Sequence, residues 1–266
     1  MHKYSKAPLP FLGQKCNWLK LINTLDFTDK IVIDLFGGSG LLSHTIQQNN
    51  PTATVIWNDF DDYQSRLNQI KATESLRQSL LQFDTQLTKA QRIDAKTQQS
   101  IIEVIQAASS ADYITISSWL LFSGNYAHSF NELISKGWYF RVTKGELNCE
   151  GYLDGVKRVQ TDFKALLNEY KNHDNVVFVA DPPYIMTNQQ GYAPGKNDAH
   201  FRLGDAIHLM RELKDQKALL FSSTKSETDD LLKALDIGIT KRTPLITSAG
   251  AGKTYTDLLY QMNWVD

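Results

Sequence analysis

The sequence has few of the residues that would commit it to disulfide or metal chemistry. Only Cys16 and Cys149 are cysteines among its 266 residues. Two thiols in a chain of this length are expected to be free in a reducing cytosol, and alone they cannot form a zinc site. The six histidines show no ligand spacing. We therefore expect neither a structural disulfide nor a bound metal.

An excess of one charge and long apolar runs are lacking as well. The formal net charge is −1, so binding to a nucleic acid would depend on local basic patches. No apolar run is long enough to cross a bilayer, and the residues after Met1 lack the apolar core of a signal peptide. These absences predict a cytoplasmic protein with no membrane partner. The length suits one large α/β domain that could carry an insertion.

The sequence is organised around a buried strand that ends in Asp181-Pro182-Pro183-Tyr184. The apolar run over residues 176–180 predicts a strand covered on both faces, as in a parallel sheet. The two prolines end it, because each lacks a backbone donor and has a fixed φ. The carboxylate and the phenol then lie at the carboxyl end of a strand, where open α/β sheets bind ligands. The alternative is a simple strand-ending turn with an aspartate cap.

A second apolar run, residues 31–36, leads directly into Gly37-Gly38-Ser39-Gly40 and a helical stretch. In this layout the backbone can approach a ligand at the start of a helix. The third glycine of the dinucleotide fingerprint and the lysine of a P-loop are both absent. The turn therefore favours a nucleotide-like cofactor, or it is only a tight connection between a strand and a helix.

The next predicted strand, residues 55–58, ends at Asp59, roughly 20 residues after the glycine turn. An acid at this distance can accept hydrogen bonds from both ribose hydroxyls of an adenosine-containing ligand. Asp61 and Asp62 follow, so the cluster could also be the carboxylate-rich start of a helix. Asp59 could serve the ligand while its neighbours serve the helix.

The middle of the chain departs from strand–helix alternation. Its pattern is helical and polar to about residue 108, and an aromatic and basic segment follows. Basic side chains interleaved with Trp138, Tyr139 and Tyr152 suit a hairpin that lies on a nucleic acid, although an ordinary solvated hairpin has the same composition. The candidate DNA contacts are Arg141, Lys144, Asn148, Lys157 and Arg158.

Beyond the organising strand, residues 186–200 form a polar, glycine-containing segment that is a candidate lid. A helix, a strand and a second helix are predicted next. Two last strands, near residues 237–246 and 255–264, are predicted to form an antiparallel hairpin.

Taken together, these motifs resemble the DNA adenine methyltransferases of the Dam type, which transfer a methyl group from S-adenosylmethionine to the exocyclic nitrogen of adenine. The resemblance covers most of the chain in the order that this family uses. Residues 10–15 resemble its N-terminal cofactor motif, 34–40 its glycine motif, Asn58-Asp59 its ribose acid, Asp162-Phe163 a pair close to the cofactor's adenine, and 181–184 its catalytic motif.

The resemblance implies an α/β fold: a doubly wound, mostly parallel, seven-stranded methyltransferase sheet with a C-terminal antiparallel hairpin and an inserted, mostly helical target-recognition region. Residues 1–66 and 156–266 would form the catalytic domain, and residues 67–155 the DNA target-recognition region. The implied cofactor contacts are Phe11, Lys15, Asp34, Phe36, Gly37, Gly38, Asp59, Asp162, Phe163 and Asp181. The implied catalytic residues are Asp181, Pro182, Pro183 and Tyr184.

The chemistry of the last motif agrees with that resemblance. An amino group conjugated to a purine is a poor nucleophile, and two acceptors, the Asp181 carboxylate and the Pro182 carbonyl, can hold both of its hydrogens and free its lone pair. Tyr184 offers a face on which a flipped-out base can stack. No metal and no covalent nucleophile is needed.

The implied partner is double-stranded DNA, with GATC as the recognition sequence suggested by resemblance and a cognate restriction endonuclease as a candidate partner. Two alternatives keep the cofactor or the DNA but change the function. One is a methyltransferase for RNA or for a protein glutamine, whose relatives more often have Asn in place of Asp181. The other is a DNA-binding relative that has lost catalysis. The oligomeric state is not indicated by the sequence.

Overall fold

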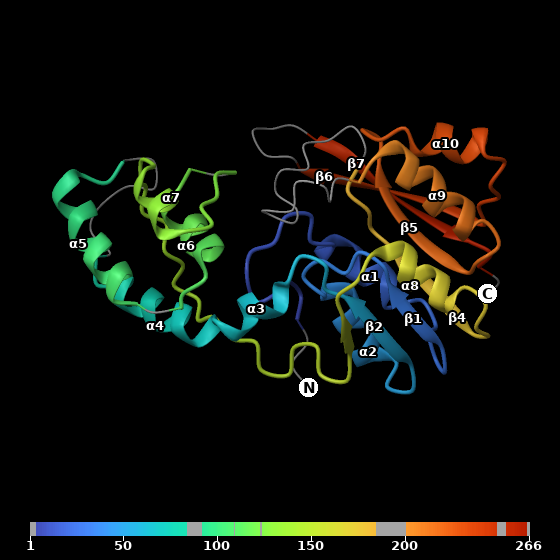
Figure 1. Cartoon of the computed structure of the whole chain (residues 1–266), viewed down its shortest axis with the longest axis horizontal. Helices are drawn as coiled ribbons and strands as arrows, with labels where there is room; N and C mark the ends of the chain where they lie inside the picture. The colour runs from blue at the N-terminus through green and yellow to red at the C-terminus, as the bar shows by residue number, and fades with distance from the viewer. Residues whose placement is uncertain are drawn as a thin grey trace.

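The computed structural model describes residues 4–83, 92–108, 110–122, 124–184, 201–248 and 254–264. Within them, seven strands form one sheet in the order β3-β2-β1-β4-β5-β7-β6 (Figure 1). The strands are β1 (Ile31–Asp34), β2 (Thr54–Asn58), β3 (Lys157–Val159), β4 (Val176–Ala180), β5 (Ala218–Ser223), β6 (Lys241–Ser248) and β7 (Thr254–Met262). The first five are parallel, and β7 runs antiparallel to both β5 and β6. The predicted fold class and its C-terminal hairpin are confirmed.

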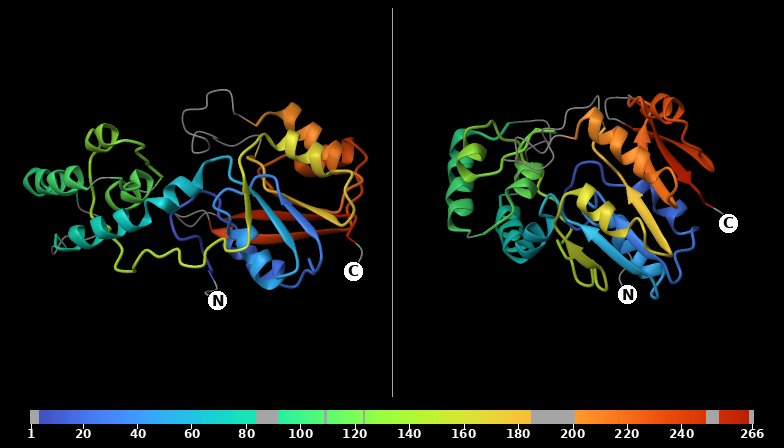
Figure 2. Two further views of the ribbon diagram at one scale, coloured as in Figure 1. Left: turned by 60° about the horizontal axis from the view of Figure 1, so that its bottom comes forward. Right: turned by 45° about the vertical axis from the view of Figure 1, so that its right-hand side comes forward.

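Helices cover both faces of this sheet. Short helices near the N-terminus, η1 (Cys16–Trp18) and α1 (Leu19–Ile22), lie with α2 (Leu41–Asn49) on one face. On the other face lie α8 (Phe163–Tyr170), α9 (Leu203–Leu213) and α10 (Thr228–Ala234). Figure 2 shows the blue α2 and the orange α9 on opposite sides of the strands. The sheet is therefore doubly wound.

The central strand β4 shows why its sequence is apolar throughout. All five of its residues are buried. Val177 and Val179 belong to the core under α1 and α2, while Val176, Phe178 and Ala180 belong to the core under α8 and α9. Because successive side chains of a strand point to opposite faces, a strand between two helical layers needs apolar residues at every position.

A separate helical body extends from the edge of the sheet (Figure 1). It contains α4 (Ile70–Leu81), α5 (Ala95–Ala107), α6 (Tyr113–Leu120) and α7 (Phe130–Ile134), and α3 (Tyr63–Asn68) connects it to the sheet. It has its own apolar core, built from residues between Leu76 and Phe140. The Arg66 guanidinium ties α3 to this body through two hydrogen bonds of 3.1 and 2.9 Å to the Asp112 carboxylate.

The chain returns from the helical body without forming the basic hairpin that the sequence predicts. Arg77 of α4 donates hydrogen bonds to the carbonyls of Thr143 and Lys144, and Glu74 accepts one from the Leu147 N–H, so α4 holds this segment along its side. The only strand-like pairing among residues 138–155, all of which the structure describes, is an isolated bridge between Arg92 and Tyr139.

The aromatic and basic residues assigned to that hairpin are instead divided among different parts of the molecule. Trp138 is buried in the helical core, and Tyr152 is buried against the sheet, where its hydroxyl donates a 2.9 Å hydrogen bond to the Ser39 carbonyl. Lys157 and Arg158 belong to β3, which pairs with β2. The predicted hairpin is wrong because a pattern of basic and aromatic residues does not determine which core each side chain joins.

The structure also bears on the cysteines, on metal binding, on membrane spans and on the candidate lid. Cys16 and Cys149 are free and half-buried. Among the described residues, no group of three histidine, cysteine or carboxylate side chains could hold a metal ion, and none of the described helices has the length and apolar character needed to span a membrane. The candidate lid over residues 186–200 lies outside the described residues.

Candidate active site

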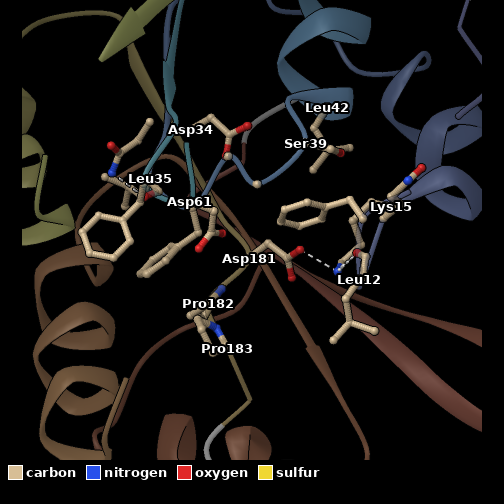
Figure 3. Close-up of a pocket in the computed structure, with 18 of the residues that line it drawn as sticks. Leu12, Lys15, Asp34, Leu35, Ser39, Leu42, Asp61, Asp181, Pro182 and Pro183 are labelled. Carbon is tan, nitrogen blue, oxygen red and sulfur yellow. Dashed lines mark hydrogen bonds and ion pairs between the residues drawn. The ribbon is translucent and has the colours of Figure 1, made fainter. Parts of the chain in front are cut away.

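The sheet brings the polar residues at the ends of several strands to one edge. Asp34 ends β1, Asn58 ends β2, and Asp181 follows β4, so the parallel strands carry all three to their common carboxyl edge. These residues line a cavity of about 330 Å³, an ordinary size for a small-molecule site. Figure 3 shows Asp34, Asp61 and Asp181 around this cavity, with Lys15 and Leu12 on the side next to Asp181.

Asp181, Pro182, Pro183 and Tyr184 all lie on the cavity wall. The Asp181 carboxylate is 19% exposed, and its Oδ2 lies 2.5 Å from the Lys15 ammonium. Burial raises the pKa of Asp181, and the nearby Lys15 opposes that rise. The Tyr184 hydroxyl donates a 3.2 Å hydrogen bond to the Ser222 carbonyl at the end of β5. The motif therefore presents a charged acceptor, a fixed carbonyl and an anchored ring in one place.

The glycine turn brings the backbone to the opposite wall of the cavity. A Cβ on Gly37 would lie 2.0 Å from Trp57 Cδ1, so only glycine fits against that indole. Gly38 has φ +48°, and a Cβ there would lie 2.8 Å from Phe11 Cε1. Phe11, Gly37 and Gly38 all line the cavity. These glycines allow the backbone to lie close to two aromatic side chains on the cavity wall, while the predicted approach to a ligand stays a prediction.

Asp34 is the most deeply buried acid on the cavity wall, with 2% of its surface exposed. Its Oδ2 accepts a 2.6 Å hydrogen bond from the Ser43 hydroxyl, whereas its buried Oδ1 has no partner among the described residues. Burial raises its pKa to about 7. A buried acceptor without a donor is costly, so a ligand that donates a hydrogen bond to Oδ1 would be stabilised there.

An aromatic group forms another part of the wall. The Phe36 and Phe163 rings lie with centroids 5.0 Å apart and planes tilted by 35°, and Phe201 packs edge-on to Phe36. Asp162 caps α8 by accepting a 2.8 Å hydrogen bond from the Lys164 N–H, which fixes Phe163 at the start of the helix. All of these residues line the cavity, and the rings suit contact with a planar heterocycle.

The acid predicted to bind ribose does not face the cavity. Asp59 has no exposed surface; its carboxylate accepts hydrogen bonds from the N–H groups of Tyr63 and Gln64 at 2.6 and 3.0 Å. Its Oδ2 also pairs with Arg158 Nε at 2.7 Å. The cavity is lined instead by Asp61, two residues further on. Asp59 therefore serves the start of α3, and Asp61 is the acid of this cluster that reaches the cavity.

The sequence matches a known enzyme family over most of its length. The profile of the family of D12 class N6 adenine-specific DNA methyltransferases matches residues 11–242. The chain belongs to this family. It is also 38% identical over 234 residues to a Haemophilus influenzae (strain Rd) protein named "putative methyltransferase", a match covering 84% of this chain and 78% of that protein. The predicted activity, adenine-specific methylation of DNA, is confirmed at the level of the family, which leaves RNA or a protein glutamine unsupported as the substrate.

The predicted DNA contacts of this methyltransferase lie in three places. Arg141 belongs to the helical body, where its guanidinium carbon lies 5.6 Å from the centre of the Phe122 ring and 5.5 Å from that of Tyr139. Lys144 and Asn148 are exposed on the returning segment. Lys157 and Arg158 are exposed on the edge strand β3, and Arg158 holds Asp59 and Asp62.

Sequence reasoning missed several residues of the methyltransferase cavity. Thr247, Tyr255 and Asp257 line it from the C-terminal hairpin, and Asp205 and Lys164 line it from α9 and α8. The hairpin residues belong to no motif, and only their position in an antiparallel pair brings them to this edge. The pattern of the last strand, with a polar Asp257 directly before an apolar run, was the one available signal.

Proposed function

We propose that this methyltransferase transfers a methyl group from S-adenosylmethionine to N6 of an adenine that is flipped out of duplex DNA. The observation that carries the proposal is the arrangement of Asp181 and Pro182 at the end of β4, on the wall of the cavity that the glycine turn also lines. Family membership supplies the adenine and the DNA.

The cavity residues fit S-adenosylmethionine. Asp34 Oδ1 is a buried acceptor without a partner among the described residues, which suits the ligand's ammonium group. Asp61 is an acid at the end of β2 suited to the ribose hydroxyls, and Phe36 and Phe163 suit the adenine ring. Gly37 and Gly38 place backbone on the wall of the same cavity. When bound, the cofactor supplies an electrophilic methyl group on a sulfonium sulfur.

Asp181 and Pro182 activate the target nitrogen. The carboxylate and the carbonyl each accept one hydrogen of the adenine amino group, which favours a tetrahedral nitrogen with a free lone pair. The negative charge of Asp181 stabilises the positive charge that develops on N6 and suits acceptance of the proton that N6 must lose. The rigid proline fixes the direction of its carbonyl, so little reorganisation is needed.

Tyr184 is the stacking surface for the extrahelical base. Its hydroxyl is anchored to the Ser222 carbonyl, which holds the ring beside Asp181 on the cavity wall. A base inside a duplex cannot present its amino group to a carboxylate at the bottom of a cavity, so the target adenine must leave the helix.

The helical body suits DNA recognition. Arg92, Lys136, Phe122 and Tyr139 line a second, open cavity on it, and Arg141 lies over the same aromatic pair. Phe122 is 55% exposed and lines this cavity beside Arg92 and Lys136, so its ring is accessible to a partner. Cations beside aromatic faces can bind phosphates and stack on bases. Residues 67–155 therefore stay our proposed target-recognition region, although Tyr152 and Leu153 pack on the catalytic core. GATC specificity and a cognate restriction endonuclease stay predictions.

The test is methylation of duplex DNA by the purified protein, with N6-methyladenine detected in the product. Asp181→Ala is expected to lower the single-turnover rate by roughly 100- to 1000-fold, because one preorganised charged acceptor is removed. Asp174→Ala, at an exposed loop position before β4, is the matched control. A folded Asp181 variant with near-normal single-turnover methylation would contradict the proposed mechanism.

A further inference from the structure

Asp257 is a buried carboxylate in the cavity that no motif includes. It is 8% exposed and lines the same cavity as Lys15 and Asp181. Its strand β7 is antiparallel to β5, and the register places Asp257 opposite Ser223, the last residue of β5. The amino-terminal part of β7 therefore reaches the same sheet edge as the carboxyl ends of the parallel strands.

The surroundings of Asp257 contain few donors for a buried charge. The Thr247 hydroxyl of β6 donates a 3.3 Å hydrogen bond to its Oδ2. Burial raises the pKa of Asp257, and the charge of Lys15, followed by Thr247 and Trp18, opposes that rise. The negative charge of Asp257 in turn raises the pKa of Asp181. The Lys15 ammonium is therefore the positive charge that stabilises the ionised form of both carboxylates.

The Lys15 ammonium is paired with the carboxylate that methyl transfer needs. It lies 2.5 Å from Asp181 Oδ2 and donates a 2.9 Å hydrogen bond to the Gly13 carbonyl. A carboxylate already paired with an ammonium is a weaker acceptor for an amino group. If Lys15 moved away with no other counter-ion, it would be a nearly buried charge without a partner, which is costly.

We propose that Asp257 is a positioning residue for methyl transfer: it gives the Lys15 ammonium a second carboxylate partner, so that Asp181 can bind the target amino group. This inference rests on the proposed function, because it assumes that Asp181 accepts the adenine hydrogens. Asp257 acts through Lys15 and touches neither the base nor the methyl group. Lys15 then pairs with Asp181 before the adenine binds and with Asp257 afterwards, so it is not a permanent partner of Asp181.

The decisive experiment is a double-mutant cycle on the single-turnover methylation rate with Lys15→Met and Asp257→Asn. We expect Asp257→Asn alone to lower the rate about tenfold, which is ~1.4 kcal/mol of barrier. In the Lys15→Met background the same change is expected to have less than about a twofold effect, because the group that Asp257 positions is gone. Equal effects in the two backgrounds would overturn the proposal and leave Asp257 a structural residue.

The pH profile tests the electrostatic part of the proposal, which is the coupling between the charges of Asp257 and Asp181. The charged and titratable groups around Asp257 are Lys15, Asp181 and Tyr255. Removing the charge of Asp257 is expected to lower the pKa of Asp181, so the acidic limb of the rate profile moves to lower pH while the plateau falls. An unmoved limb together with a reduced plateau would contradict the proposal.

Asp229→Asn is the matched control. Asp229 holds the same hairpin through Arg242 at 2.8 Å and through the Tyr260 hydroxyl, but it does not line the cavity. The Asp229→Asn change is expected to lower thermal stability. It should leave the coupling between Lys15 and Asp257 and the pH dependence of the methylation rate unchanged. The parent protein separates the two hypotheses: absence of adenine methylation by the parent refutes the proposed function, whereas an active parent with an uncoupled cycle refutes only the role of Asp257.

Discussion

The sharpest prediction concerns two acids that the sequence does not distinguish, Asp59 and Asp61. Asp61→Asn is expected to weaken binding of S-adenosylmethionine, because Asp61 lines the cavity and Asp59 does not. A hydrogen bond to a charged group contributes about 1.5–3 kcal/mol, so the dissociation constant should rise roughly 10- to 150-fold. Thermal stability should fall less than in Asp59→Asn, because Asp61 is only half-buried whereas Asp59 is fully enclosed.

The opposite result is expected for Asp59→Asn. Asp59 accepts two backbone hydrogen bonds at the start of α3 and pairs with Arg158, which is 37% exposed. Loss of a helix cap costs about 1 kcal/mol, and a partly exposed ion pair adds little, so stability should fall by about 1–2 kcal/mol. Affinity for the cofactor should stay within about twofold of the parent value.

Isothermal titration calorimetry and thermal unfolding on the same two variants measure both quantities. A large loss of affinity in Asp59→Asn with an unchanged Asp61→Asn would refute the assignment of the ribose contact to Asp61. Loss of affinity in both would mean that the start of α3 and the cofactor site are one cooperative unit.

The remaining predictions concern charged residues. The pKa of Asp34 is raised to about 7 in the folded protein, above its ordinary 3.8, so the folded state holds the proton more tightly and stability should fall as pH rises from 3.8 to 7. Deprotonation of Asp34 supplies the negative charge that the ammonium group of the cofactor would meet, so cofactor affinity should rise as the pH rises through about 7. Asp34→Asn should abolish that rise and should flatten the slope of stability against pH in chemical denaturation; an unchanged slope would contradict the raised pKa of Asp34. Arg141→Ala with Lys144→Ala should flatten the salt dependence of DNA binding by about one unit of slope for each phosphate that the variant no longer neutralises, without changing cofactor affinity. Arg158→Ala should mainly destabilise α3. If Arg158→Ala were the only change that flattened the salt dependence of DNA binding, the DNA-docking surface would lie on β3 instead.

The sequence by itself determined the elements whose physics is local. Five consecutive apolar residues before two prolines define β4 as a strand covered on both faces and end it at Asp181. The turn after β1 is visible as Gly37-Gly38-Ser39-Gly40, and the hairpin of β6 and β7 follows from two strands with a short connection. These features depend on neighbours in the chain, so their patterns are sufficient.

Tertiary structure decided which side chains meet. Asp59 and Asp61 differ only in the direction in which the chain leaves β2, and that direction is set by the packing of α3. Asp257 lines the same cavity as Lys15 because β7 pairs antiparallel with β5, in a register between residues far apart in sequence. Arg158 belongs to Asp59 rather than to a DNA-binding hairpin because β3 pairs with β2. Local periodicity specifies an element and its buried face, whereas charge pairs across the sheet depend on strand order, which only the packed core determines.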